Sequence, residues 1–444
     1  MADNAISPHE ARTNAGLAGK SSDALRRHAK QWGLAVLFAL FLLESSFAAE
    51  SKAATVPRAP SAESLQALID RAANDDPKLT GVLLAVYSPS HGLDWQGASG
   101  YFALGNTLRL QPAQPFRLAS VTKVYTAATV LRLVEQGLLA LTDPINTRVS
   151  GDTAALLRDG GYDPALIQIS HLMSHTSGLV DHGATKAFFE QIVADGQHHW
   201  TRHEQIALAM ANGPPRGAPG LAYHYSDTGY VILGEIIERA TGHSLARAFR
   251  DELKFGRLGL DSTWFESLEP QPQRALSRAH QYLDVGDVDI TNFDPSFDLY
   301  GGGGLVSTTR DLTRFFRALI LGELFTQRPT LAAAFTVPDV ARGERDASYA
   351  LMLPTLAFGP HLCWGKAGAW GSIGLYCPDI DLSVGLSVNR SRSKTPTQLL
   401  ENLAKLIDAA WEVPRSDGWP LHPLASSRTL LPRPVVLNSQ QRRI

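Results

Sequence analysis

Apolar residues recur at two different spacings along this chain, and the two spacings occupy different regions. Near both ends the pattern is that of strands. Residues 81–87 form a continuous apolar run, and residues 381–389 alternate apolar and small side chains with a period of two. Between residues 140 and 350 the spacing is mostly helical. We therefore predict one sheet assembled from both ends of the chain, with a mainly helical subdomain inserted between its strands.

The predicted elements give an α+β fold, an antiparallel sheet flanked by helices. Helices are predicted at 61–73, 116–137, 169–175, 230–242, 308–320 and 395–411, and strands at 81–87, 91–100, 362–368, 372–377 and 381–389. Ser307 or Thr308 is expected to cap one helix, and Gly137 and Gly242 to end two others. A ligand cleft is expected where the sheet meets the helical subdomain, which covers about residues 138–355.

The start of the chain is typical of an export signal. Arg26, Arg27 and Lys30 precede an uncharged run at 31–43, which is shorter than the roughly 20 residues that span a bilayer. The protein is thus expected to be periplasmic or secreted, with a membrane contact only through the transient signal peptide; an uncleaved anchor is the alternative. The predicted organisation is a signal peptide with a long n-region at 1–48, a linker at 49–60, a folded domain at 61–412 and a tail at 413–444.

The net charge argues against a nucleic-acid partner, and the cysteine content leaves open whether a disulfide forms. The formal net charge is −2, so the chain lacks the basic footprint of a nucleic-acid-binding protein. The two cysteines, Cys363 and Cys377, flank a predicted hairpin turn. They form either one disulfide across two strands or two buried thiols, and they are too few for a cysteine zinc site. The sequence does not indicate an oligomeric state.

Ser120 and Lys123 lie at the start of the helix predicted at 116–137. Residues three apart share one face of a helix, so the hydroxyl and the amine can reach the same point. A helix N-terminus favours negative charge and therefore suits a nucleophile. Serine needs a base to remove its proton. A lysine, with a reference pKa of about 10.4, can act as that base only if burial or a second cation favours its neutral form.

Three motifs together resemble the serine β-lactamase and penicillin-binding protein family, in the branch of class C β-lactamases, DD-peptidases and esterases. Ser120-Val-Thr-Lys123 matches the Ser-x-x-Lys signature. Tyr225 and Asp227 lie in a segment similar to the family's Tyr-x-Asn region. Lys366 and Gly368 lie in one similar to its Lys-Thr-Gly strand, and the resemblance also covers residues 169–179 and 302–312 within a span of about 62–411.

The resemblance implies a β-lactamase/DD-peptidase-like fold and an acyl-enzyme at Ser120. Lys123 and Tyr225 would share the general-base and general-acid work. Lys366 would hold positive potential over the site, and the backbone N–H groups of Ser120 and Ala369 would form the oxyanion hole. Neither a cofactor nor a metal is implied. The substrate would be a small molecule or peptide with an amide or ester bond, such as a D-amino-acid peptide.

Two positions depart from the family pattern. Asp227 replaces the usual Asn; a carboxylate cannot donate to a substrate carbonyl, but it can pair with Lys123 and shift the role of base to Tyr225. Ala367 replaces a Thr or Ser whose hydroxyl helps to bind a substrate carboxylate. Both changes argue against an efficient β-lactamase. An esterase, a weak β-lactamase and a non-catalytic peptidoglycan-binding or sensor protein remain alternatives, as does a register that places Ser226 in a Ser-Asp-Asn element.

Three further features are expected to be structural. His171 and His175 lie four apart on a predicted helix, but no matching acid or third histidine completes a metal site. Gly301–Gly304 is not followed by the Lys-Ser/Thr of a phosphate loop and is expected to form a tight turn. His198 and His199 are expected to lie in a solvated loop.

Overall fold

The computed structural model describes residues 59–341 and 349–411, all within the part of the chain that begins at Pro57. The predicted signal peptide and the predicted tail lie outside the described residues, as does nearly all of the predicted linker.

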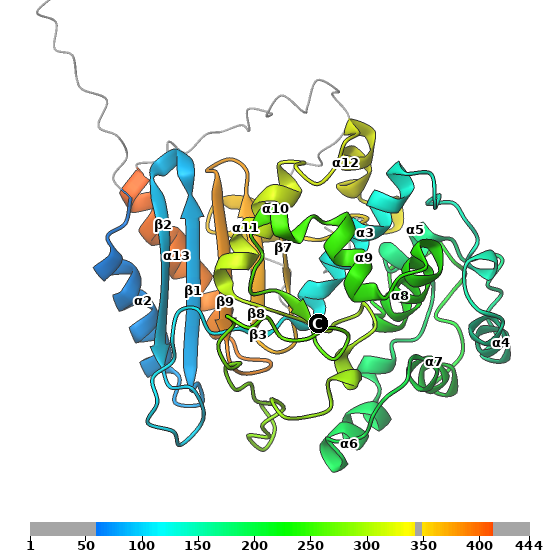
Figure 1. The fold of residues 1–444 in the computed structure, drawn as a ribbon, viewed down its shortest axis with the longest axis horizontal. Helices are drawn as coiled ribbons and strands as arrows, with labels where there is room; N and C mark the ends of the chain where they lie inside the picture. Colours follow the sequence, from blue (N-terminus) through cyan, green and yellow to red (C-terminus); the bar gives the residue numbers. More distant parts are fainter. Residues whose placement is uncertain (1–58, 342–348, 412–444) are drawn as a thin grey trace, which may run out of the picture. The chain divides into compact units, whose positions relative to one another are not determined.

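A six-stranded antiparallel sheet combines strands from both ends of the chain, as the hydrophobic pattern predicts (Figure 1). The strand order is β2-β1-β9-β8-β7-β6, so the N-terminal hairpin pairs with the last strand. The bounds are β1 (Gly81–Ser88), β2 (Leu93–Gly100), β6 (Thr355–Phe358), β7 (His361–Ala367), β8 (Ser372–Cys377) and β9 (Leu382–Val388).

Helices cover both faces of this sheet. On one face, α2 (Ala62–Asp75) and α13 (Thr395–Trp411) pack side by side over a core that includes Val82 and Leu84. On the other face lies α11 (Thr309–Ile320), which begins at the predicted cap Thr308. A Cβ at Gly385 would meet the backbone oxygen of Thr309 at 2.2 Å. The small residues that alternate along β9 therefore let α11 approach the sheet closely.

The inserted region is mainly helical, and α3 (Thr122–Glu135) lies between it and the sheet (Figure 1). Eleven of the residues of α3 are buried, which explains why its sequence is apolar on nearly every side. The remaining helices are α4 (Gly151–Asp159), α5 (Ile169–Met173), α6 (Lys186–Ala194), α7 (Arg202–Ala211), α8 (Asp227–Thr241), α9 (Leu245–Glu252), α10 (Phe255–Leu258) and α12 (Arg328–Ala334). Together with the sheet, they confirm the predicted fold class.

Several short strands escaped the sequence analysis. A second sheet has three strands, in the order β3 (Phe116–Arg117), β5 (Leu305–Ser307) and β4 (Trp264–Phe265). In the six-stranded sheet, β6 is an edge strand that the sequence analysis did not predict. The helix predicted from residue 116 begins only at Thr122, after β3 and a 3₁₀ turn, η2 (Ala119–Val121). Strands of two to four residues are too short to show a period of two, so tertiary pairing alone defines them.

The question of the two cysteines is settled by a disulfide between Cys363 on β7 and Cys377 on β8. The pairing register places Trp364 opposite Tyr376. The two cysteines are the next residues along the two strands, farther from the hairpin turn, and therefore face each other. Their Cα atoms lie 4.2 Å apart.

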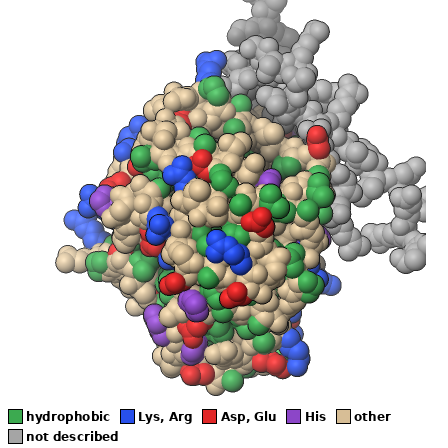
Figure 2. All heavy atoms as spheres, turned by 90° about the vertical axis from the view of Figure 1, so that its right-hand side faces the viewer, with side chains coloured by type: hydrophobic (Ala, Val, Ile, Leu, Met, Phe, Trp, Pro, Cys, Tyr) green, Lys and Arg blue, Asp and Glu red, His purple; other side chains and the backbone are tan. Residues whose placement is uncertain are grey.

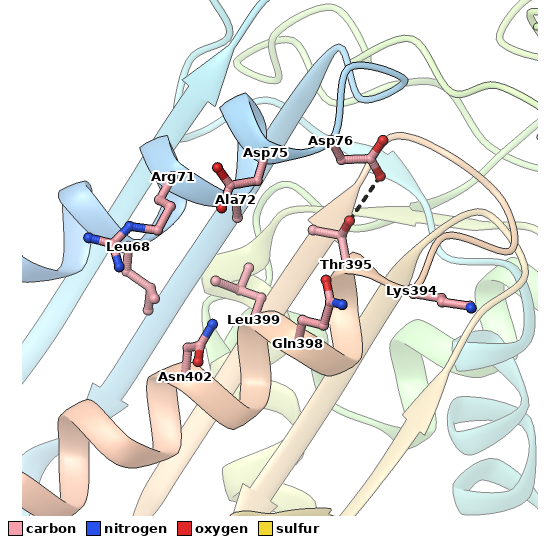
Figure 3. Close-up of a pocket in the computed structure, with 10 residues that line it drawn as sticks. All are labelled: Leu68, Arg71, Ala72, Asp75, Asp76, Lys394, Thr395, Gln398, Leu399 and Asn402. Atoms are coloured by element: carbon pink, nitrogen blue, oxygen red, sulfur yellow. Dashed lines mark hydrogen bonds between the residues drawn. The ribbon is translucent and has the colours of Figure 1, made fainter.

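Helix length and surface charge are the features of the described residues that bear on a membrane or nucleic-acid partner. No helix within residues 59–341 and 349–411 is long and apolar enough to cross a bilayer. On the face seen in Figure 2, acidic and basic side chains are interspersed, and no broad patch of one sign stands out. A polar pocket lies between α2 and the start of α13, where the Thr395 hydroxyl donates to Asp76 at 3.0 Å (Figure 3). None of the predicted site residues lines it.

His361, at the start of β7, connects two other elements through its ring. Its Nδ1 lies 2.5 Å from an oxygen of Asp379 in the turn between β8 and β9, and its Nε2 lies 2.9 Å from Asp408 on α13. Burial disfavours the charged ring, but hydrogen bonds and charge from both carboxylates outweigh it and raise the pKa of His361. The stabilisation from protonated His361 is therefore fully present below its unfolded pKa and is lost as pH rises through the folded one.

Replacing this histidine tests that linkage. We expect His361→Gln to lower the free energy of unfolding by about 1–3 kcal/mol below a pH of about 6.5, because two charge-assisted hydrogen bonds are lost. The deficit should shrink as pH rises, since the wild-type ring then loses its proton. Urea denaturation of both proteins across a pH series measures the difference. A deficit that is the same at every pH would contradict the assignment.

Candidate active site

Ser120 lies in η2, immediately before α3, in the turn that joins β3 to the buried helix. The residue before it, Ala119, has a φ of 47°, in the left-handed region that only glycine adopts without strain. The Ser372 hydroxyl donates to the carbonyl of Leu118 at 2.7 Å and connects this turn to β8. The serine is therefore held in a fixed position at the edge of the main sheet.

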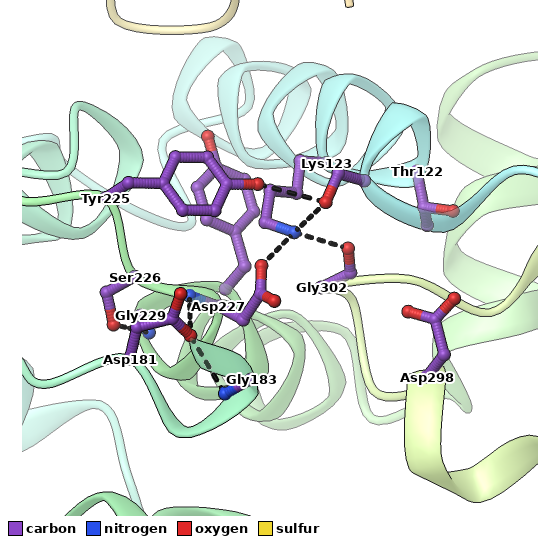
Figure 4. Close-up of polar contacts among 12 residues, drawn as sticks. Thr122, Lys123, Asp181, Gly183, Tyr225, Ser226, Asp227, Gly229, Asp298 and Gly302 are labelled. Carbon is purple, nitrogen blue, oxygen red and sulfur yellow. Dashed lines mark hydrogen bonds and ion pairs between the residues drawn. The ribbon is translucent and has the colours of Figure 1, made fainter. Parts of the chain in front are cut away.

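Lys123, in the first turn of α3, is fully buried and has three acceptors around its amine (Figure 4). Its Nζ donates to Ser120 Oγ at 3.0 Å and to the carbonyl of Gly302 at 2.6 Å, and it forms an ion pair with the Asp227 carboxylate. An ammonium has three N–H donors, and here each has one partner. The pairing of Lys123 with Asp227 that the sequence analysis expected is present.

Tyr225 reaches the same serine from the segment before α8. Its hydroxyl donates to Ser120 Oγ at 3.0 Å, so the serine oxygen accepts two hydrogen bonds at once. Burial raises the pKa of Tyr225 well above its ordinary value, and the negative charge of Asp227 adds to this shift. The tyrosine therefore rests as a neutral donor rather than as a phenolate base.

His175 supports the tyrosine from behind. Its ring lies against the Tyr225 ring with 4.2 Å between centroids, and its Nδ1 accepts the backbone N–H of Ser226 at 3.1 Å. Burial lowers the pKa of His175 well below its ordinary value, and the ammonium groups of Lys366 and Lys123 act in the same direction. The ring is thus neutral, and its contacts hold the segment that carries Tyr225.

Lys366 lies on β7 and is buried, not exposed on an edge strand. Its Nζ is 4.6 Å from the centroid of the Tyr225 ring and 4.8 Å from that of Tyr349. A cation over the face of a ring is attracted to its electrons, and it also stabilises negative charge on the phenol oxygen. Lys366 therefore lies close to Tyr225, and its role as the source of positive potential stays a prediction.

The turn from β7 to β8 brings Ala369 to the pocket that Ser120 lines. A Cβ on Gly368 would meet the carbonyl oxygen of Leu118 at 2.2 Å, so only glycine allows this close approach. Ala369, the next residue, lines one pocket together with Ser120. Within the described residues, neither the Ser120 N–H nor the Ala369 N–H donates a hydrogen bond to another group. Both are free to receive an oxyanion.

Asp227 is the first residue of α8, and a second carboxylate supports it. Burial would raise the pKa of Asp227, but the Lys123 ammonium holds it below its ordinary value. Asp181 accepts the backbone N–H groups of Asp227 at 3.1 Å and Gly183 at 3.0 Å. Burial, together with the Asp227 charge, raises the pKa of Asp181 to about 7.

The rival register for Ser226 does not fit this arrangement. Ser226 caps α8: its hydroxyl accepts the N–H of Gly229 at 3.4 Å and donates to the carbonyl of Val180 at 3.2 Å. It makes no contact with Ser120. The structure therefore brings together Ser120, Lys123, Tyr225, Asp227, Lys366, Gly368 and Ala369, as the motifs predict, and leaves Ser226 as a helix cap.

The sequence analysis missed several residues that shape the pocket around Ser120. His182, Asp298 and Gly302 line it, and Asp181 lies beneath Asp227. Burial lowers the pKa of His182 to about 4, so its ring is neutral. No local pattern marks these positions, because each acts through contacts with residues distant in sequence. Only the similarity of the Gly302 segment to the family hinted at one of them.

A family model described as Beta-lactamase matches residues 69–408. The chain belongs to the beta-lactamase family. The match contains every one of the seven predicted site residues, and it agrees with the fold class derived from the strand order.

Individual relatives within the family carry different names. The chain is 35% identical over 253 residues to the esterase EstB of Burkholderia gladioli, covering 52% of this chain and 61% of the relative. It is 28% identical over 257 residues to penicillin-binding protein 4* of Bacillus subtilis, covering 55% and 53%. The matches thus span about half to three-fifths of these curated relatives.

A solved D-stereospecific amidohydrolase from a Streptomyces species shares the fold. The two structures superimpose with a TM-score of 0.65 and 24% sequence identity, over 77% of this chain and 97% of the other. At this identity the likeness supports the architecture and not the substrate.

Proposed function

We propose that this protein is a serine acyl-hydrolase that cleaves amides or esters of D-amino-acid derivatives through an acyl-enzyme at Ser120. The observation that carries the proposal is the convergence of two donors on one oxygen: Lys123 Nζ and Tyr225 OH each lie 3.0 Å from Ser120 Oγ. The similarity to an esterase, a penicillin-binding protein and a D-stereospecific amidohydrolase supports this reaction class.

The reaction needs a neutral amine, and the Asp227 carboxylate can provide it. Lys123 is buried and Asp227 is partly buried, so transfer of one proton from Lys123 to Asp227 removes two charges from a site that solvates them poorly. The neutral Lys123 then accepts the Ser120 proton through the contact that already joins the two side chains. This assigns the role of base to Lys123, which the raised pKa of Tyr225 favours.

In acylation, the Ser120 oxygen bonds to the substrate carbonyl carbon while its proton moves to Lys123. The carbonyl oxygen becomes an oxyanion held by the N–H groups of Ser120 and Ala369, a kind of contact worth roughly 10²–10³ in rate. The bond to the leaving group then breaks, and Tyr225 gives that group its proton. The resulting phenolate lies beside the protonated Lys123 and beneath Lys366, and both cations stabilise it.

Deacylation reverses these proton movements. The Tyr225 phenolate takes a proton from water, and the hydroxide attacks the acyl carbonyl carbon. The bond to Ser120 breaks, and Lys123 returns the serine proton. All groups regain their starting states, so no cofactor is required.

Removing the serine hydroxyl tests the nucleophile. We expect Ser120→Ala to lower hydrolysis of a p-nitrophenyl ester and of a D-amino-acid p-nitroanilide by about 10³-fold or more, because no acyl-enzyme can form. A fluorescent fluorophosphonate and a fluorescent penicillin should label the wild type, and mass spectrometry should place the adduct on Ser120. Ser90→Ala, which changes an exposed serine, is the control.

The opposite outcome would favour a non-catalytic binder. If the wild type neither labels nor hydrolyses any compound that the Ser120→Ala protein spares, the hydrolase proposal fails. Asp227 and Ala367, the departures from the family pattern, would then mark a member that binds peptides without turnover.

Replacing Asp227 tests the proton balance. We expect Asp227→Asn to raise β-lactam hydrolysis by about tenfold, because the amine loses its counter-charge and the new amide can donate to a substrate carbonyl. Steady-state hydrolysis of nitrocefin measures the rate, with the Ser120→Ala/Asp227→Asn double variant as background. A rate that stays the same or falls would show that Lys123 reaches its neutral form only by passing its proton to Asp227, so that losing this acceptor outweighs the gain from the amide.

Export is the remaining part of the proposal. The basic residues and the uncharged run at 31–43 support it, and so does the disulfide, which suits an oxidising compartment. When the full chain is expressed in a Gram-negative host, the periplasmic protein should begin close to Ala49, as measured by intact mass. A chain that keeps Met1 and stays in the cytoplasm would contradict export.

A further inference from the structure

Asp298 is a carboxylate in the Ser120 pocket that the proposed reaction does not use. It ends the 3₁₀ turn η5 (Pro295–Asp298) and lines the same pocket as Ser120 and Asp227. Trp370 Nε1 donates to its Oδ2 at 2.6 Å. Its other oxygen accepts no hydrogen bond from the described residues, and no described Lys, Arg or His forms an ion pair with it. In Figure 4 it stands apart from the contacts around Lys123.

A half-buried carboxylate that forms no ion pair with a described cation is costly, so its presence needs a reason. Burial raises the pKa of Asp298, and the hydrogen bond from Trp370 together with the charges of Lys123 and Arg117 only partly offsets this effect. Holding the Trp370 indole does not require a charge, because an amide oxygen at this position would accept the same N–H. The loop also makes room for the carboxylate: a Cβ on Gly303 would lie 1.8 Å from Asp298 Oδ1.

Both apolar and polar side chains line the rest of the pocket. Its cavity measures about 100 Å³, and beside Ser120 and the two carboxylates its walls include Phe188, Val231, Phe297, Leu299 and Trp370 as well as His182 and Gln205. The Phe297 and Trp370 rings pack edge to face with 5.7 Å between centroids, which makes one wall rigid. A ligand that complements this pocket has an apolar body and one positively charged group.

A second pocket gives the other half of the substrate a place to lie. It shares Ala369 and Trp370 with the first and continues along the Ala367–Ile373 turn toward Arg392. Trp370 thus lines both spaces, and so does Ala369, one of the two predicted oxyanion donors. An acyl group in the first pocket leaves the second one for the leaving group.

We propose that Asp298 binds a protonated amine on the acyl part of the substrate, so that the enzyme prefers amides and esters of apolar amino acids with a free α-amino group. The inference rests on the proposed function and names the substrate class of the same site. Asp227 is already neutralised by Lys123, so Asp298 is the carboxylate that remains for recognition.

The test compares substrates that differ only in the amine. D-Phenylalanine p-nitroanilide and its L-enantiomer carry it, and 3-phenylpropionyl p-nitroanilide has hydrogen in its place. At a pH of about 6.5 the amine is mostly protonated. We expect wild-type kcat/KM to be at least about tenfold higher for one amine-bearing enantiomer than for the neutral compound, because a hydrogen bond between two charged groups is gained.

Asp298→Asn isolates the charge, since the amide keeps an acceptor for Trp370. We expect the ratio of the two kcat/KM values to fall by about tenfold, toward one. Asp159→Asn makes the same chemical change at an exposed position at the end of α4 and should leave the ratio unchanged. Where the wild type is labelled at Ser120 but cleaves neither amide, protection from fluorophosphonate by D-phenylalaninamide and by 3-phenylpropionamide gives the same ratio.

The outcomes separate the two proposals. Equal wild-type rates, or equal protection, with and without the amine would overturn the role of Asp298 and leave the hydrolase standing. A wild-type preference for the amine that Asp298→Asn retains would also overturn it. The wild-type comparison stands even if the variant fails to fold. Absence of both Ser120-dependent labelling and hydrolysis would instead overturn the proposed function, and this inference with it.

Discussion

The arrangement of the site depends on one buried ammonium group. Lys123 is shielded from solvent, so its charge is tolerable only if protein oxygens replace water. Its acceptors come from three separate segments: Ser120 in the turn before α3, Asp227 at the start of α8 and Gly302 before β5. The need to satisfy one amine therefore brings three parts of the chain together, and the nucleophile is one of them. Structure and chemistry share the same contacts.

The glycines around the site let these segments pack closely because they have no side chain. Their contribution here is the space they leave, not backbone flexibility. A Cβ at Gly234 would lie 2.0 Å from the backbone carbonyl oxygen of Tyr300. Helix α8 can therefore approach the chain just before Gly301–Gly304 only because residue 234 has no side chain. Gly368 allows the same closeness between the β7–β8 turn and Leu118. Since the acceptors of Lys123 are backbone and side-chain atoms of these segments, a small shift of either would lengthen a hydrogen bond to the amine. Close backbone packing is thus part of what positions the serine.

Local patterns in the sequence predict the long elements and the motif residues, but not the contacts that complete the site. The alternation in β9 and the apolar face of α13 repeat often enough to be read directly. Ser120 and Lys123 are one helical turn apart, so their proximity follows from the helix. The Gly302 carbonyl is 179 residues from Lys123, and Asp298 sits in a short turn without periodicity. Contacts of this kind are set by how the sheet and helices pack, which no local window contains.

The two carboxylates near Ser120 differ in how their charges are balanced. Asp227 forms an ion pair with Lys123, so its charge is neutralised within the protein and is not available to a ligand. Among the described residues, the Trp370 N–H is the one hydrogen-bond donor to Asp298, and it orients the carboxylate without neutralising it. A cationic ligand group would therefore gain more at Asp298 than at Asp227, although both line the same space. An anionic group would find the positive potential of Lys366 over the Tyr225 ring but no hydroxyl at Ala367. For the proposed substrate preference, the important quantity is therefore the charge of Asp298, which no described cation pairs with, rather than the total number of charges in the pocket.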